Sequence, residues 1–204
     1  MLKTLCLGGS FNPIHYGHLI CARAAAENAN LNRVLLIPSD QPPHKPNDVA
    51  LADAADRLAM TQAAIAGHRT FAVADLEIGR PGPSYTIDTA RALKQQGFEQ
   101  VNWLIGADLL PQLPTWHEPD ALLEEVTFWV MQRPGSTIDW PSLPPPLQAL
   151  RKRLLVVPQI DISATDIRRR VHNGRLIDFL TPPPVVRYIE EHRLYGWKEI
   201  AAPK

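Results

Sequence analysis

Short runs of hydrophobic residues recur along the chain and alternate with stretches whose hydrophobic residues keep a helical spacing. Six runs are predicted to be β-strands: Leu2–Leu7, Arg33–Ile37, Phe71–Ile78, Val101–Ile105, Thr127–Met131 and Leu154–Val157. They lack the strict alternation of a half-exposed strand, which favours burial on both faces of a parallel sheet. Because strands and helices alternate, the crossovers are expected to be right-handed. The pattern therefore predicts an α/β fold with an open, doubly wound parallel sheet.

The clearest helical spacing lies in the segment 51–65, and a weaker one lies in 87–94. The stripe of the first segment is broken only by Gln62 and comprises Leu51, Ala54, Ala55, Leu58 and Ile65. We expect this stripe to be the buried face of its helix.

The end of the chain predicts a small helical pair. Ser163, with Asp166 three residues later, is typical of a capped helix start. This helix is expected to reach about His172 and to end at Asn173–Gly174, and a last helix should run from Pro184 through Arg193. We interpret 163–195 as a C-terminal helical subregion within a single domain of residues 1–204.

Composition narrows the function classes. The chain has 204 residues, of which 45% are hydrophobic, and 21 basic residues balance 21 acidic ones. With no net charge, nothing favours nucleic acid or an anionic membrane as a partner, so any bound anion needs a local cluster. No hydrophobic run approaches the roughly 18–20 residues of a membrane span, and two cysteines form no disulfide framework. A cytoplasmic protein is expected.

A glycine-rich string, 8–19, follows the first predicted strand and carries two histidines. Glycines at the end of a strand allow backbone N–H groups to approach an anion closely. The next helix is expected to begin near Gly17, so His15 and His18 flank its positive end and can donate to phosphate oxygens. The spacing matches neither the dinucleotide-binding Gly-x-Gly-x-x-Gly motif nor a Walker P-loop. A metal pair would lack a third ligand nearby in the sequence.

The predicted helix start at 163 is a second candidate anion site. Ser163 and Thr165 lie at its N-terminus, and Arg168 follows within two turns. Arg169 and Arg170 would point away from Arg168 on a helix, so we expect them to be solvated.

These two motifs together resemble the signature of the nucleotidylyltransferase superfamily. The first is Gly9-x-Phe11-x-Pro13-x-His15-x-Gly17-His18 and the second is Ser163-x-Thr165-x-x-Arg168, with Ala164 where that superfamily often has a second serine. The resemblance implies a Rossmann-like nucleotidylyltransferase fold. It also implies catalytic roles for His15, His18 and Arg168. The further ATP contacts that it implies in these motifs are Gly8, Gly9, Ser10, Phe11, Ser163 and Thr165.

Three further strings resemble the bacterial nicotinate mononucleotide adenylyltransferases in particular. They are 38–45, 84–89 and 106–110, the last followed by Trp116. The family resemblance implies transfer of the adenylyl group of ATP to nicotinate mononucleotide, which gives deamido-NAD and pyrophosphate.

The resemblance also assigns roles in these strings. His44 and Lys45 would bind the mononucleotide phosphate. Ser84 would cap a helix whose Tyr85 and Thr86 amides bind the nicotinate carboxylate. Trp116 would stack on the pyridinium ring or serve as a core or lid aromatic. On the ATP side, Gly106 and Asp108 would contact the nucleotide, with Asp108 at a ribose, and Arg133 would lie beside the adenine. The role of Asp88 is undecided.

The expected cofactor is Mg²⁺ held by phosphates and water, with no ligands from protein side chains. Several alternatives stay open. The acceptor could be nicotinamide mononucleotide or another phosphorylated compound such as phosphopantetheine, and homo-oligomer formation is undecided. A nucleotide-sensing or nucleic-acid-binding module on the same fold is the alternative that is not an enzyme.

Overall fold

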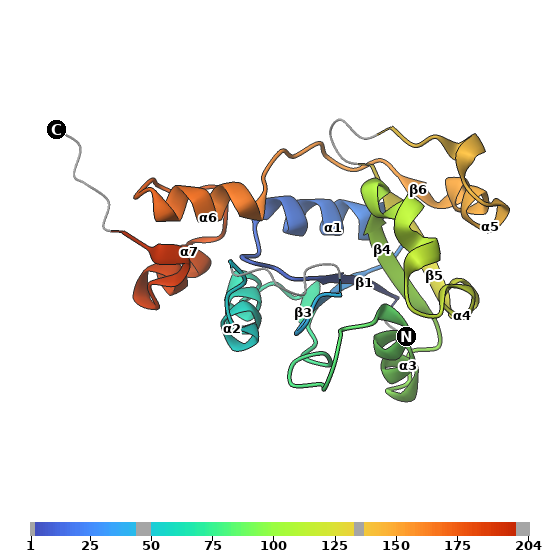
Figure 1. Cartoon of the computed structure of the whole chain (residues 1–204), viewed down its shortest axis with the longest axis horizontal. Coiled ribbons are helices and arrows are strands. Elements are labelled where there is room, and N and C mark those ends of the chain that lie inside the picture. The colour runs from blue at the N-terminus through green and yellow to red at the C-terminus, as the bar shows by residue number, and fades with distance from the viewer. Residues whose placement is uncertain (1–2, 44–49, 133–136, 199–204) are drawn as a thin grey trace.

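The computed structural model describes residues 3–43, 50–132 and 137–198, and parallel strands form its central sheet (Figure 1). The strands are β1 (Thr4–Gly9), β2 (Arg33–Pro38), β3 (Phe71–Val73), β4 (Val101–Gly106), β5 (Val126–Met131) and β6 (Leu154–Leu155). Their order is β3-β2-β1-β4-β5-β6. The chain moves outward from β1 to β3 and then returns beside β1 as β4. This order confirms the expected doubly wound parallel sheet.

Helices cover both faces of this sheet, with α1 on one side and α3 on the other (Figure 1). The α-helices are α1 (Tyr16–Asn28), α2 (Ala54–Ala64), α3 (Thr86–Gln95), α4 (Pro119–Glu125), α5 (Pro145–Gln148), α6 (Ala164–His172) and α7 (Pro183–Glu191). The 3₁₀ helices are η1 (Ala107–Thr115), η2 (Trp140–Ser142), η3 (Ala149–Arg153) and η4 (Leu194–Gly196).

Successive residues of the central strands point to opposite faces, and both faces are buried. In β2, Val34 and Leu36 join a hydrophobic cluster with α1, α6 and α7. Leu35 and Ile37 join a second cluster with α3 and η1. This two-sided burial explains why β2 reads as a continuous hydrophobic run in the sequence.

The third predicted strand, Phe71–Ile78, is wrong in its second half, because β3 ends at Val73. The chain then turns, and the Ile78 amide donates to the Asp75 carbonyl at 2.9 Å. Gly79 follows with φ of 73°, and its amide donates to Asp40 Oδ2 at 2.8 Å. The hydrophobic run therefore continues past the strand into a turn that is fastened to the loop after β2.

The predicted hydrophobic stripe of α2 is not its buried face. Gln62 and Ala55 are exposed. The positions that α2 buries are Arg57, Met60, Thr61 and Ala64. Two polar residues lie on the buried face because their side chains bond to backbone carbonyls, so a stripe drawn from hydrophobicity alone is rotated away from it.

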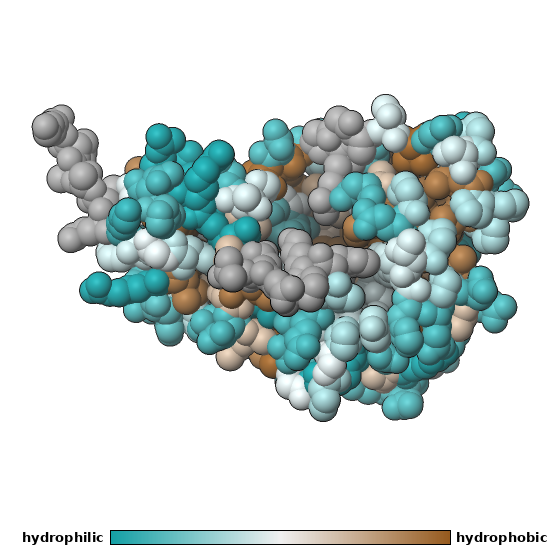
Figure 2. Space-filling view, in the orientation of Figure 1, coloured by the Kyte–Doolittle hydropathy of each residue, from teal (hydrophilic) through white to brown (hydrophobic). Residues whose placement is uncertain are grey.

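The C-terminal helical pair is confirmed. Ser163 caps α6 by accepting from the Asp166 amide at 3.1 Å, and Asn173 ends it, followed by Gly174 with φ of 63°. The last helix, α7, begins one residue earlier than predicted and ends at Glu191. The space-filling view is mostly hydrophilic with scattered hydrophobic residues (Figure 2). Among the described helices, none has the length and apolar character needed to span a membrane.

Candidate active site

A cleft of about 650 Å³ opens at the carboxyl ends of the central strands. β1 pairs with β4 at Leu5–Asn102 and Cys6–Trp103, whereas it stays paired with β2 as far as Gly9. The two halves of the sheet therefore part between β1 and β4, where the strand order reverses. Ligands of open α/β sheets bind at such a point.

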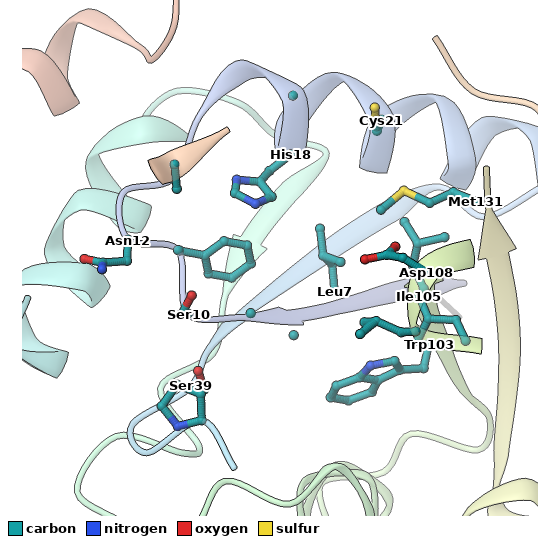
Figure 3. Close-up of a pocket in the computed structure, with 18 of the residues that line it drawn as sticks. Leu7, Ser10, Asn12, His18, Cys21, Ser39, Trp103, Ile105, Asp108 and Met131 are labelled. Carbon is teal, nitrogen blue, oxygen red and sulfur yellow. The ribbon is translucent and has the colours of Figure 1, made fainter. Parts of the chain in front are cut away.

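Gly8 lies at this parting and has no room for a side chain. A Cβ atom on Gly8 would lie 2.7 Å from the Trp103 ring. Figure 3 shows Trp103, Asp108 and Met131 on one side of the cleft and His18 and Asn12 on the other. The glycine therefore lets β1 run along the floor of the cleft beside a large aromatic ring.

His15 and His18 form the start of α1, as the sequence predicts. His15 is the N-cap, and its Nδ1 accepts from the His18 amide at 3.4 Å, while His18 Nδ1 accepts from the His15 amide at 3.3 Å. Their rings stack with centroids 3.6 Å apart. Both residues line the cleft.

This reciprocal cap selects a tautomer for each ring. A nitrogen that accepts a hydrogen bond from a backbone amide carries no proton, so the assigned proton of a neutral ring lies on Nε2. Gly17 keeps this arrangement compact, because a Cβ atom there would lie 3.0 Å from the His15 ring. The cap thus fixes both rings so that Nε2 is the donor nitrogen.

Arg168 reaches the same cleft from α6. Its Nη1 donates to the Asn12 carbonyl at 2.9 Å, and Ser163, Thr165 and Arg168 all line the cleft. As expected, Arg169 points elsewhere, since it pairs with Asp166 on the exposed surface. The structure therefore brings the two motifs together, although they are about 150 residues apart in the sequence.

The start of α3 is a third helix N-terminus on the cleft. Tyr85 is its N-cap, without a side-chain cap bond, and Tyr85 and Thr86 line the cleft. The Tyr85 amide donates to the Pro83 carbonyl at 2.9 Å, so the turn already uses it. Of the two predicted amide donors, Thr86 is thus the better placed for an anion.

Ser84 is not the N-cap that the sequence predicts. Its Oγ instead accepts from the amides of Asp40 at 3.1 Å and Gln41 at 3.3 Å. Ser84 is buried and lines the cleft, so it fastens the loop after β2 to the start of α3. The sequence predicts the wrong role for Ser84 because a serine before a helix can bond either to that helix or to another part of the chain.

Glu77 was missed by the sequence prediction, because it lies in the segment that was predicted to be a strand. It is buried and lines the cleft, and the Thr89 hydroxyl donates to Glu77 Oε1 at 2.6 Å. Burial raises the pKa of the Glu77 carboxyl, against the hydrogen bond from Thr89. The carboxyl holds the first turn of α3 against the cleft wall.

The opposite wall is built by η1 and its end. Asp108 and Trp116 line the cleft, whereas Gly106 ends β4 and is not among the lining residues. The Trp116 ring also meets Phe128 edge-on at 6.4 Å between centroids. Trp116 is therefore both a partly buried aromatic and a cleft residue. His117 was missed, and its ring stacks on Tyr85 with centroids 4.2 Å apart.

The remaining lining residues predicted from the glycine-rich string are in place: Gly8, Gly9, Ser10 and Phe11. His44, Lys45 and Arg133 lie outside the described residues. In the described ranges, no three His, Cys, Asp or Glu side chains form a group suited to a metal ion. The roles assigned to His44, Lys45 and Arg133 stay predictions.

Comparisons with known proteins agree with this geometry. Residues 6–170 match the cytidylyltransferase-like family model. A Roseiflexus sp. (strain RS-1) protein named "Probable nicotinate-nucleotide adenylyltransferase" is 45% identical over 191 residues, which cover 93% of this chain and 96% of that protein. A Thermomicrobium roseum protein with the same name is 42% identical, with coverage of 100% and 96%.

A solved structure shares the fold. It is "Plasmodium falciparum nicotinic acid mononucleotide adenylyltransferase complexed with NaAD", with a TM-score of 0.75, 21% identity, and coverage of 96% of this chain and 98% of that chain. The chain therefore belongs to the cytidylyltransferase-like family, in the branch of the nicotinate-nucleotide adenylyltransferases.

Proposed function

We propose that this enzyme transfers the adenylyl group of ATP to nicotinate mononucleotide. The observation that carries the proposal is the convergence of three helix N-termini, those of α1, α3 and α6, on one cleft. Each N-terminus favours an anion through its dipole and its amides. The two substrates bring matching groups: a triphosphate, a mononucleotide phosphate and a ring carboxylate. The cleft volume lies within the usual range for small-molecule sites.

The reaction joins two anions, so it depends on alignment and on stabilisation of charge. An oxygen of the mononucleotide phosphate forms a bond to the α-phosphorus of ATP. The bond between the α-phosphorus and the oxygen that bridges it to the β-phosphate breaks, and pyrophosphate leaves with the electron pair. Because the nucleophile is already an anion, no general base is required. His15, His18 and Arg168 would stabilise the transferred group and the leaving pyrophosphate.

Mg²⁺ belongs to this proposal as the partner of the triphosphate. It binds phosphate oxygens and water in sites of this kind and neutralises part of their charge. Asp108 is a carboxylate on the cleft wall, and the family resemblance assigns it to a ribose. The chain's own contribution is the set of donors from α1 and α6.

The nicotinate end of the cleft would lie at the start of α3. Thr86 begins the helix, and Trp116 lines the same cleft. A ring carboxylate at the helix start and a pyridinium over an indole face both suit nicotinate mononucleotide. The amide form lacks the negative charge that the helix start favours, so we expect the acid form to be preferred.

The direct test is pyrophosphate release from ATP and Mg²⁺ with nicotinate mononucleotide as the acceptor. Nicotinamide mononucleotide and phosphopantetheine are the comparison acceptors, and a reaction without acceptor gives the background. We expect the highest kcat/KM with nicotinate mononucleotide. A higher value with either comparison acceptor would replace the proposed substrate, and release that needs no acceptor would contradict the transfer itself.

Trp116→Ala is expected to impair use of the mononucleotide more than use of ATP. Loss of a ring stack costs about 1–3 kcal/mol, so KM for the mononucleotide should rise about fivefold or more while KM for ATP changes less than about threefold. Trp140→Ala is the matched control, because Trp140 is also partly buried against the second hydrophobic cluster but does not line the cleft. The opposite pattern, with ATP more affected, would assign Trp116 to the ATP side.

A further inference from the structure

Tyr195, in the short helix η4 near the C-terminus, contacts the loop between β1 and α1. Its hydroxyl donates to Asn12 Oδ1 at 2.9 Å, across 183 residues of sequence. Asn12 follows Phe11 in the loop between β1 and α1 and lines the cleft, whereas Tyr195 does not. The hydrogen bond to Asn12 therefore links Tyr195 to the cleft.

Asn12 in turn holds Arg168. The Asn12 carbonyl accepts from Arg168 Nη1 at 2.9 Å. The Asn12 side chain also bonds to the chain before α2, since Nδ2 donates to the Ala50 carbonyl at 2.9 Å and Oδ1 also accepts from the Ala52 amide at 3.1 Å. Asn12 is 3% exposed. Its position, and hence that of the carbonyl that orients Arg168, is set by three hydrogen bonds to its side chain.

The backbone around this contact is held in an uncommon conformation. Tyr195 has φ of 58° and ψ of 28°, and Phe11, next to Asn12, has φ of 44°. The left-handed region is rare for bulky residues and persists only where the surroundings determine it. Burial raises the pKa of the Tyr195 hydroxyl, although the nearby guanidinium groups of Arg168 and Arg57 act to lower it. The hydroxyl thus stays protonated and remains a donor at neutral pH.

We propose that Tyr195 is a positioning residue, which fixes Asn12 and through it sets the guanidinium of Arg168 against the reacting phosphates. This inference rests on the proposed function, because it assigns Arg168 a task in the transfer. It gives the C-terminal segment after α7 a part in the reaction. A hydroxyl that orients a transition-state donor should affect kcat more than KM, because a slightly misplaced donor weakens stabilisation of the developing charge.

Tyr195→Phe removes the hydroxyl alone, and Tyr188→Phe is the matched control. Tyr188 lies in α7, just before that segment, and its hydroxyl also donates at 2.9 Å, but to Asp56 Oδ1 on α2, away from the cleft. We expect Tyr195→Phe to lower kcat about tenfold with both KM values within about twofold, a size typical of one lost hydrogen bond. Tyr188→Phe should keep kcat within about twofold of the wild-type value, while its shift in Tm should be similar to that of Tyr195→Phe.

A double-mutant cycle with Arg168→Lys separates positioning from a general loss of stability. Lysine keeps the charge but not the planar fork of donors. In the Arg168→Lys background, Tyr195→Phe should lower kcat less than about twofold further, because the group that it positions is already gone. The comparison holds even where Tyr195→Phe lowers Tm more than the control does.

Three results would overturn the inference: an unchanged kcat in Tyr195→Phe, an equal loss in Tyr188→Phe, or the full tenfold loss in the Arg168→Lys background. The wild-type enzyme serves as the reference for the proposed function. If it makes no deamido-NAD, the proposed function fails. If it does and Tyr195→Phe matches it, only the positioning role fails.

Discussion

Replacement of His18 by alanine is expected to lower kcat by about 10²–10³, the loss that follows removal of a donor aimed at developing charge. His18 lies at the positive end of α1 on the cleft wall, and its Nδ1 is engaged by the His15 amide. The proton of the neutral ring therefore lies on Nε2, the nitrogen that can donate to a phosphate. Steady-state kcat for pyrophosphate release measures the effect, and a near-normal value would remove His18 from the mechanism.

Two further variants separate the catalytic donor from the helix cap. His18→Asn places an acceptor near the position of Nδ1 and keeps the bond from the His15 amide, but it has no donor at the Nε2 position. His18→Gln places a donor near Nε2 and loses the cap. We expect Gln to retain more kcat than Asn, and Asn to retain more of the free energy of unfolding, where a lost cap costs about 1 kcal/mol. The reverse order of kcat would mean that the cap, and not the donor, accounts for the effect of His18.

The sequence predicts the sheet and the two phosphate motifs well, because both rest on local signals. A strand buried on both faces appears as an unbroken hydrophobic run, as in β2. The glycine-rich string and the Ser163 cap need only neighbouring residues to form. Parallel topology then places both motifs at the carboxyl ends of the strands, so their convergence on one cleft could be anticipated.

Contacts between distant segments could not be predicted in this way. The Ser84 hydroxyl bonds to the loop after β2 in preference to the helix that it precedes. Glu77 and Arg57 are charged residues on buried positions, and hydrophobic patterns place such residues outside the core. Their partners are hydroxyls and carbonyls from other parts of the chain, and no local spacing marks them. The residues that sequence reasoning missed are therefore those whose contacts come from distant parts of the chain.

Arg57→Met is expected to lower the free energy of unfolding by about 3 kcal/mol or more, since it leaves several buried acceptors without their donor. Arg57 is 1% exposed. Its Nε donates to the Ala52 carbonyl at 2.8 Å, and its two terminal nitrogens donate to the carbonyls of Ser10 at 2.9 Å, Ser39, and Asp40 at 2.9 Å. Burial lowers the pKa of the guanidinium, and the nearby Asp40 opposes this. Methionine can fill much of the space but cannot donate.

Urea denaturation of both proteins measures the difference, and Arg23→Met is the matched control. Arg23 is an exposed arginine that forms an ion pair with Glu27, one turn along α1. Its loss should cost less than about 0.5 kcal/mol, as for other exposed helix pairs. A loss below about 1 kcal/mol in Arg57→Met would mean that water or neighbouring donors replace the guanidinium.

Arg57→Met should also lower kcat/KM, because carbonyls that Arg57 binds belong to the cleft wall. Ser10 follows β1 and Ser39 follows β2, and both line the cleft. One planar group with fixed donor directions therefore joins the loop after β1, which leads into α1, to the loop after β2. Arg57→Lys keeps the charge but bonds to fewer of these carbonyls at once. It should recover part of the stability while kcat/KM stays below that of the wild type, and full recovery of both by lysine would show that only the charge matters.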